Sequence, residues 1–127
     1  MTAAITEGIK ISVRTHYLEG ESEPEEAKYY FVYTVVIENQ GVQPAQLITR
    51  HWIIKNALNE VQEVYGEGVV GKTPSLAPGE HFVYASLCPL STPWGVMGGT
   101  YGMTRPDGTN FVVRVPTFAL LPPYMLN

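Results

Sequence analysis

The chain has little of what several large classes of protein require. Cys88 is its single cysteine, so no disulfide can form within it. Its uninterrupted apolar runs are far shorter than the ~20 residues that a membrane-spanning helix needs. Its first residues lack the basic region and apolar core of a secretory signal. These absences predict a cytoplasmic protein of a reducing compartment such as the bacterial cytosol, with no membrane partner.

Positive charge is also scarce, with 8 Lys and Arg against 12 Asp and Glu and a net charge of −4. Nucleic-acid binding requires clustered Lys and Arg that displace counterions, so we expect no nucleic-acid partner. Many of the glutamates crowd into residues 19–27, where like charges and Pro24 predict a solvated, flexible loop. A site for a cation or a basic partner is the alternative interpretation of this loop.

The length of 127 residues suits one domain with a substantial core, which we place at residues 1–127. We expect its first residues, about 1–7, to be a short flexible N-terminus. No segment shows a sustained helical period, whereas period-two alternation of apolar residues recurs along the chain. It predicts about seven strands. Their expected ranges are 9–17, 29–39, 45–57, 61–65, 81–89, 96–105 and 110–121.

One of these strands, 45–57, has apolar residues in both alternating sets, which is typical of a central strand covered on both faces. Turn residues separate the strands: Asn59, the pair Pro78-Gly79 in a type II turn, and Pro106-Asp107-Gly108-Thr109 in a hairpin. Strands joined by turns without intervening helices predict an all-β fold. We expect an antiparallel β-sandwich of the immunoglobulin or fibronectin type III class.

The glycine spacing of Gly66-Glu67-Gly68-Val69-Val70-Gly71 copies the phosphate fingerprint of dinucleotide-binding enzymes. That fingerprint requires a helix after the last glycine, with its amino end facing the anion. Here Pro74 and Pro78 follow, and proline costs roughly 3 kcal/mol inside a helix. The segment therefore gives no support to a dinucleotide-binding enzyme.

Two interpretations of this loop stay open. Glycines between strands serve as bulges or allow close crossings of the chain. Alternatively, successive N–H groups of a tight turn can bind an anion without a helix, which makes Gly66, Gly68, Gly71 and Lys72 candidate anion- or nucleotide-binding residues. Arg105 could add positive charge if the fold brings it near.

Arg50-His51-Trp52 is the densest group of chemically capable side chains. Alternation along a strand puts His51 on one face and the two larger side chains on the other. If Trp52 is a core residue, the Arg50 guanidinium must reach a carboxylate or carbonyl groups, or emerge at the rim.

Catalytic and metal-binding patterns are weak. His16, His51, His81 and Cys88 lack the short spacings that present metal ligands together. The hydroxyl and thiol candidates have no neighbouring base to activate them. These candidates are Ser86, Ser91, Thr92 and Cys88. We expect Cys88 to be a small buried apolar residue, no metal site, no cofactor and no enzymatic activity.

Five segments together resemble the ApaG family of small bacterial proteins. They are Arg50-His51-Trp52, 66–71, 76–80, 90–101 and 111–122. The resemblance spans nearly the whole chain and implies a fibronectin type III-like sandwich. It also implies a link to magnesium and cobalt handling, and a gene neighbouring that of a diadenosine tetraphosphate hydrolase. Residues 55–60 depart from the expected Asp-containing turn that ends in glycine, and Asn59 replaces it by tolerating a positive φ.

The sequence thus favours a non-enzymatic module that binds one or more partner proteins, since a sandwich offers sheet edges that can receive a strand. The alternative is binding of pyrophosphate, a nucleotide or another phosphate-containing ligand at the 66–71 loop. Direct sensing of cobalt or magnesium is a third hypothesis.

Overall fold

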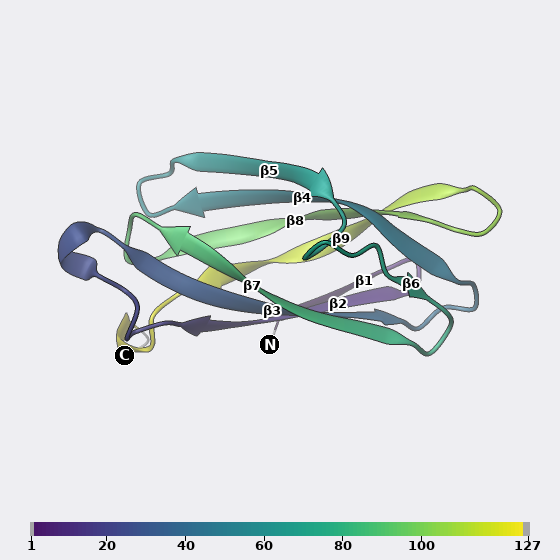
Figure 1. The fold of residues 1–127 in the computed structure, drawn as a ribbon, viewed down its shortest axis with the longest axis horizontal. Coiled ribbons are helices and arrows are strands. Elements are labelled where there is room, and N and C mark those ends of the chain that lie inside the picture. The colour runs from purple at the N-terminus through teal and green to yellow at the C-terminus, as the bar shows by residue number, and fades with distance from the viewer. Residues whose placement is uncertain (1, 126–127) are drawn as a thin grey trace.

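Strands make up most of the computed structural model, which describes residues 2–125 (Figure 1). Two short 3-10 helices, η1 (Pro24–Glu26) and η2 (Pro123–Met125), complete it. The strands are β1 (Thr2–Thr6), β2 (Ile9–Tyr17), β3 (Tyr29–Asn39), β4 (Ala45–Asn56), β5 (Val61–Glu67), β6 (Ser75–Leu76), β7 (His81–Leu90), β8 (Gly95–Thr104) and β9 (Asn110–Leu120). No helix in this part of the chain is long and apolar enough to cross a membrane.

The strands form two antiparallel sheets that pack face to face. One sheet has the order β1-β2-β3-β7, and the other has the order β5-β4-β8-β9, with β6 also paired to β4. The predicted antiparallel sandwich is confirmed, and all seven predicted strands are present. Two further strands, β1 and β6, were not predicted.

The alternation in β2 and β3 places one face of the first sheet in the core. Ile11 pairs with Ile37 and Val13 with Val35, and all four side chains are almost completely buried. β-branched residues suit such positions because they pack well on a pleated surface. The first sheet therefore follows the period-two pattern of the sequence directly.

The N-terminus corrects one expectation. Residues 1–7 were expected to be flexible, but Thr2–Thr6 form β1 and pair with β2 in a regular register from Thr2↔Val13 to Thr6↔Ile9. The turn between the strands uses Glu7 and Gly8, both with positive φ. The side chains of β1 are mostly exposed, Ile5 included, so the strand depends on backbone pairing and has only a weak apolar pattern.

β4 corrects a second expectation, because only one of its faces is covered. Ala45 and Leu47 point into the core, but farther along the strand the inward residue is Trp52, whereas Ile53 is exposed. A shift in the β4–β8 register between Leu47 and Thr49 separates the two parts. This β-bulge moves the inward set from odd to even positions, which puts apolar residues in both alternating sets of the sequence.

Three turns match their predictions. Asn59 has a φ of 63° between β4 and β5. Gly79 has a φ of 87°, and the Glu80 N–H donates to the Ala77 carbonyl at 2.9 Å. Gly108 also has a φ of 87° in the hairpin between β8 and β9. Short polar side chains and glycine tolerate this left-handed region, so these positions set where each strand ends.

The two sides of the sandwich differ. On one side β1 and β2 contact β9, and the Arg114 N–H donates to Thr6 Oγ1 at 3.2 Å. On the other side the edge strands are β5 and β7, and a cleft of about 260 Å³ lies between the sheets there. In Figure 1 the segment after β5 runs between β4 and β7 on this side. The sandwich is thus closed along one edge, whereas the other edge is only partly covered by this segment and stays open at the cleft.

Candidate binding site at the open edge

The 66–71 loop continues from the end of β5 into a small turn. The Gly68 N–H donates to the Ile48 carbonyl at 2.7 Å, and Val69 and Lys72 exchange two backbone hydrogen bonds of 2.8 and 2.9 Å. The Val69 side chain is only 1% exposed and belongs to the core. The loop is therefore anchored to the sandwich through Val69, and no helix follows it, as the prolines predicted.

Each glycine of the motif has a local structural reason. A Cβ at Gly66 would lie 2.6 Å from the Arg50 guanidinium, and one at Gly68 would collide with the Lys72 carbonyl. Gly68 and Gly71 also have positive φ values of 65° and 78°, which glycine adopts without strain. These observations support the structural interpretation of the spacing.

Of the candidate anion-binding residues, Gly68 and Lys72 already donate their backbone N–H groups within the protein. Gly71 and the Lys72 side chain lie at the exposed tip of the turn. Arg105 lies in the β8–β9 hairpin, where its guanidinium stacks on Phe111 at 4.2 Å. Anion binding by the loop stays a prediction.

Arg50 lies on the inward face of β4 and reaches the loop. Its Nη1 donates to the Glu67 and Gly68 carbonyls at 3.0 and 2.9 Å. The guanidinium lies against Gly66, its register partner on β5. Of the alternatives for Arg50, the contact with carbonyl groups is confirmed, and the two carbonyls fix the orientation of the cation.

The cleft beside Arg50 has a mixed lining. Trp52, Val64 and Met97 contribute apolar groups, and Tyr33 and Ser86 contribute hydroxyl groups. These residues come from both sheets, so the cleft exists only because the edges β5 and β7 stay apart. The sequence pointed to Arg50 but not to this cleft.

Buried phenols lie behind the cleft. The hydroxyl groups of Tyr84 and Tyr101, which come from opposite sheets, share a hydrogen bond. Burial raises the pKa of Tyr84, of Tyr101 and of Tyr33, while the positive charge of Arg50 acts in the opposite direction. Burial also raises the pKa of the Cys88 thiol to about 11, which agrees with the expected inert, buried cysteine.

Alkaline pH is expected to unfold the protein through these groups. Their folded pKa values exceed the ordinary values of 10.0 for tyrosine and 9.0 for cysteine. Their contribution to stability is therefore complete below the ordinary values and is lost as the pH rises through the folded values. Circular dichroism should show unfolding that begins above the ordinary pKa values. Tyrosinate absorbance of the buried phenols should appear together with the unfolding. Ionisation of all tyrosines near their ordinary pKa in an intact fold would contradict this.

His51 lies on the opposite face of β4 from Arg50 and Trp52, as predicted. Its ring stacks on Tyr65 with centroids 4.0 Å apart, and its Nε2 lies 3.8 Å from a Glu63 carboxylate oxygen. His16 and His81 are exposed on strands of the other sheet. Within residues 2–125, no group of three or more His, Cys, Asp and Glu side chains is placed to hold a metal ion.

The hydroxyl candidates are likewise separate. Thr92 is buried and accepts the Ala57 N–H at 3.1 Å while donating to the Trp94 carbonyl at 2.7 Å. Ser91 is exposed and Ser86 lines the cleft. Thr92 thus holds the β7–β8 turn against the end of β4.

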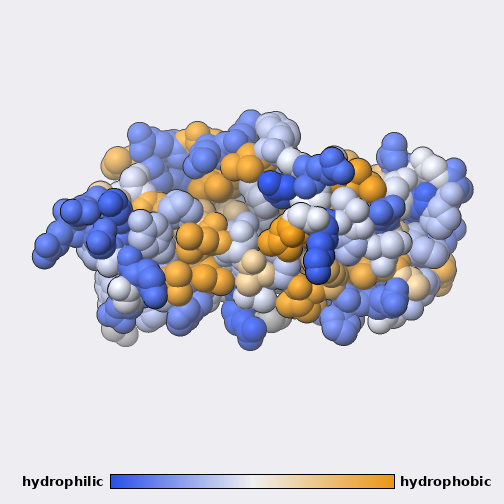
Figure 2. Space-filling model, in the orientation of Figure 1, coloured by the Kyte–Doolittle hydropathy of each residue, from blue (hydrophilic) through white to orange (hydrophobic). Residues whose placement is uncertain are grey.

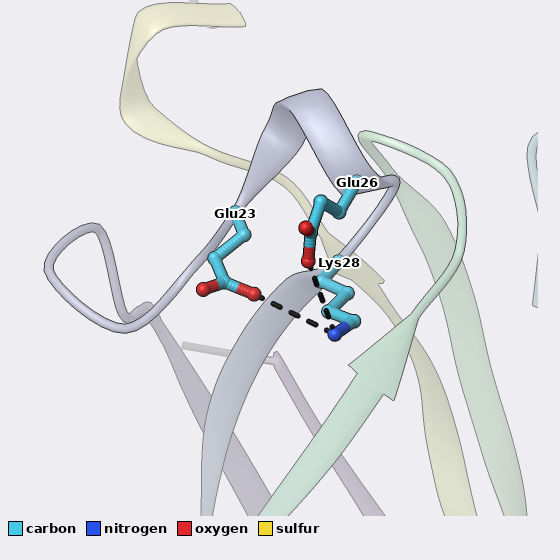
Figure 3. Close-up of polar contacts among 3 residues, drawn as sticks. All are labelled: Glu23, Glu26 and Lys28. Carbon is cyan, nitrogen blue, oxygen red and sulfur yellow. Dashed lines mark ion pairs between the residues drawn. The ribbon is translucent and has the colours of Figure 1, made fainter.

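The acidic loop has more local order than a flexible connection requires. It contains η1, and Lys28 Nζ lies 3.6 Å from Glu23 and 3.2 Å from Glu26 (Figure 3). All three side chains are well exposed, and exposed pairs contribute little to stability. The solvated position is as predicted, and two glutamates of the loop pair with the neighbouring Lys28.

The fold and the open-edged cleft define an antiparallel β-sandwich of the immunoglobulin or fibronectin type III class, with its candidate site between two edge strands. A family model described as the ApaG domain matches residues 19–105. Protein ApaG of Anaeromyxobacter dehalogenans is 50% identical over 127 residues, which is 100% of both chains. Protein ApaG of Methylobacterium sp. (strain 4-46) is 48% identical over 125 residues, covering 98% of this chain and 96% of the relative.

A crystal structure from Bordetella pertussis is similar in both sequence and shape. Its TM-score is 0.89 at 49% identity, and the match covers 91% of this chain and 94% of that chain. The chain belongs to the ApaG family. The family resemblance and the predicted fold are both confirmed.

Proposed function

We propose that this protein is a non-enzymatic interaction module that receives an extended strand of a partner protein at the free edge of β7. The Asn39 N–H donates to the Glu80 carbonyl at 2.9 Å. Hydrogen-bonded pairs alternate along an antiparallel ladder. The even-numbered residues of β7, like Glu80, therefore bond to β3. The N–H and C=O groups of Val83, Ala85 and Leu87 consequently face the free edge.

The character of this edge carries the proposal. Val83 and Leu87 are 51% and 52% exposed, and Figure 2 shows hydrophobic side chains along the course of β7. Edge strands usually carry charges or prolines that prevent pairing. From Phe82 to Cys88 β7 has neither, whereas the other open edge, β5, carries Glu63 and Glu67. A partner strand with apolar side chains would complete this edge.

A lysine at Val83 is expected to abolish partner binding, since it places a charge beside the pairing edge. Capture from bacterial extract should identify a protein that binds the wild type. Calorimetry should then show that Val83→Lys binds this protein with at least tenfold lower affinity. Val112→Lys is the matched control, because Val112 lies on β9 of the other sheet and is 60% exposed. This variant should bind the partner protein as the wild type does. Equal loss in both variants, or a partner unaffected by Val83→Lys, would contradict strand addition at β7.

Binding of pyrophosphate or a nucleotide at the 66–71 loop is the second candidate. The observation that supports this function is the conformation of the turn. Val70 and Gly71 both have positive φ, and Lys72 follows them at the exposed end of the turn. Millimolar pyrophosphate, ATP or diadenosine tetraphosphate should then move the amide signals of Gly66, Gly68 and Gly71 in an NMR titration. Unmoved signals would leave the loop as a structural element.

The link to magnesium and cobalt handling that the family resemblance implies belongs to the same proposal. If the protein senses the metal directly, cobalt should broaden NMR signals around His16, His51 or His81. Unchanged spectra would leave the partner protein as the connection to metal handling.

A further inference from the structure

We propose that the cleft between β5 and β7 binds a small ligand with an oxyanion group, and that Arg50 contacts the oxyanion. The ligand class is a carboxylate or phosphate monoester attached to one compact apolar group. This site adjoins the free edge of β7, with which it shares Leu87, and it is distinct from the tip of the 66–71 loop.

The charge of Arg50 is the first reason. Within residues 2–125, Lys28 and His51 are the basic side chains that lie near a carboxylate, and Arg50 has no carboxylate within pairing distance. Its two hydrogen bonds go to neutral carbonyls, which orient the cation without neutralising it. Arg50 is half-buried, so its guanidinium has given up part of its hydration, and an anion bound beside it would compensate that loss.

The remaining donors of Arg50 are the second reason. Both hydrogen bonds to the described residues come from Nη1, so Nη2 and Nε are left for a ligand. A guanidinium offers its donors in a planar fork that matches the two oxygens of a carboxylate or phosphate. Because Gly66 and two carbonyls hold this fork in place, little side-chain freedom is lost on binding.

The lining of the cleft is the third reason. Its volume of about 260 Å³ is below the range of ~300–1,000 Å³ typical of drug-sized ligands, so a ligand no larger than a substituted single ring would fill it. Trp52, Val64 and Met97 provide the apolar contacts, and Tyr33 and Ser86 provide hydroxyl groups beside the cation. No carboxylate is among the residues that line it.

The nearest glutamates of β5 do not oppose an anion in the cleft. Gln62, Val64 and Gly66 share the inward face of β5, while Glu63 and Glu67 alternate onto the outer face. The Glu63 carboxylate lies near His51 on the outer face of β4, which confirms that Glu63 points away from the cleft. The field inside the cleft is therefore dominated by Arg50.

The experiment is an NMR titration of isotope-labelled full-length protein with benzoate, phenyl phosphate and benzamide. Benzamide is a neutral molecule of the same shape as benzoate. We expect saturable shifts of the Trp52 indole, the Ser86 amide and the Arg50 Nε signal with at least one of the two anions. The affinity for benzamide should be at least tenfold lower, because it lacks the charge.

Variants separate the cleft from general charge effects. Arg50→Gln should abolish the titration, whereas Arg14→Gln, the same charge change on the exposed face of β2, should leave it intact. Because Arg50→Gln could also disturb the loop, Gln62→Trp is a second test. Gln62 is exposed at the mouth of the cleft, so a bulky residue there should block entry without changing the core.

Three results would overturn the proposal: no saturable shifts with either anion, equal binding of benzamide and benzoate, or shifts confined to Val70 and Gly71. The last result would assign anion binding to the loop tip. Val83 does not line the cleft, so Val83→Lys should titrate like the wild type even where it has lost partner binding. Failure at the cleft is thereby distinguishable from failure of strand addition at β7.

Discussion

Replacing Trp52 by alanine is expected to cost about 3–5 kcal/mol of unfolding free energy, as for other buried aromatic residues. Trp52 is 3% exposed and lies edge-on to Tyr33, Tyr101 and Phe118 with centroid distances of 5.3, 6.0 and 6.1 Å. These rings come from both sheets, so the cavity would open where the sheets meet. A domain with roughly 5–15 kcal/mol of stability would lose a large fraction of it.

The second tryptophan provides the matched control. Trp94 is 40% exposed in the turn between β7 and β8, and its backbone carbonyl accepts a hydrogen bond from Thr92 Oγ1 at 2.7 Å. Urea denaturation should therefore show a clearly smaller loss of unfolding free energy for Trp94→Ala than for Trp52→Ala. Similar losses for the two variants would mean that Trp52 is not the residue that joins the sheets.

The strands were largely predictable because most of them bury one face. In β2 and β3 the alternation of residue types sets both the ladder and the core. The sequence did not predict β1 and β6, for two different reasons. β1 has mostly exposed residues and depends on backbone pairing with β2, whereas β6 has two residues and cannot display a period.

The inward face of β4 could not be read from the sequence because the bulge after Leu47 is a property of the pair β4 and β8. An extra residue in one strand reverses the parity of all that follow. Apolar residues at both parities then look like two buried faces, although Thr49, Ile53 and Lys55 are exposed. The neighbouring strand, absent from any local window, decides between the two interpretations.

The site was predictable in part. The prolines after Gly71 were enough to exclude a helix, and alternation was enough to direct Arg50 inward with Trp52. The pairing of Arg50 with Gly66 follows once the Asn59 turn fixes the β4–β5 register, and counting outward from that turn could have found it. The cleft needed the spatial separation of β5 and β7, which no spacing in the sequence encodes.

Gly99→Ala is expected to be nearly as damaging as the loss of Trp52, although it adds only one methyl group. A Cβ at position 99 would collide with the His51 carbonyl group and lie 3.1 Å from Trp52 Cα. These are backbone atoms of β4 in the β4–β8 ladder, where Trp52 pairs with Gly99. They cannot move aside as a flexible side chain can, so overpacking should cost about 3 kcal/mol or more.

Gly20→Ala is the control for Gly99→Ala, because a Cβ at Gly20 would meet nothing within 4 Å and should leave stability nearly unchanged. Hydrogen exchange should show lost protection in β4 and β8 of the Gly99 variant, with β2 and β3 less affected. Since β4 also carries Arg50, the same displacement should weaken anion binding in the cleft. A Gly99→Ala protein with wild-type stability and protection would show that β8 does not need glycine for its approach to β4.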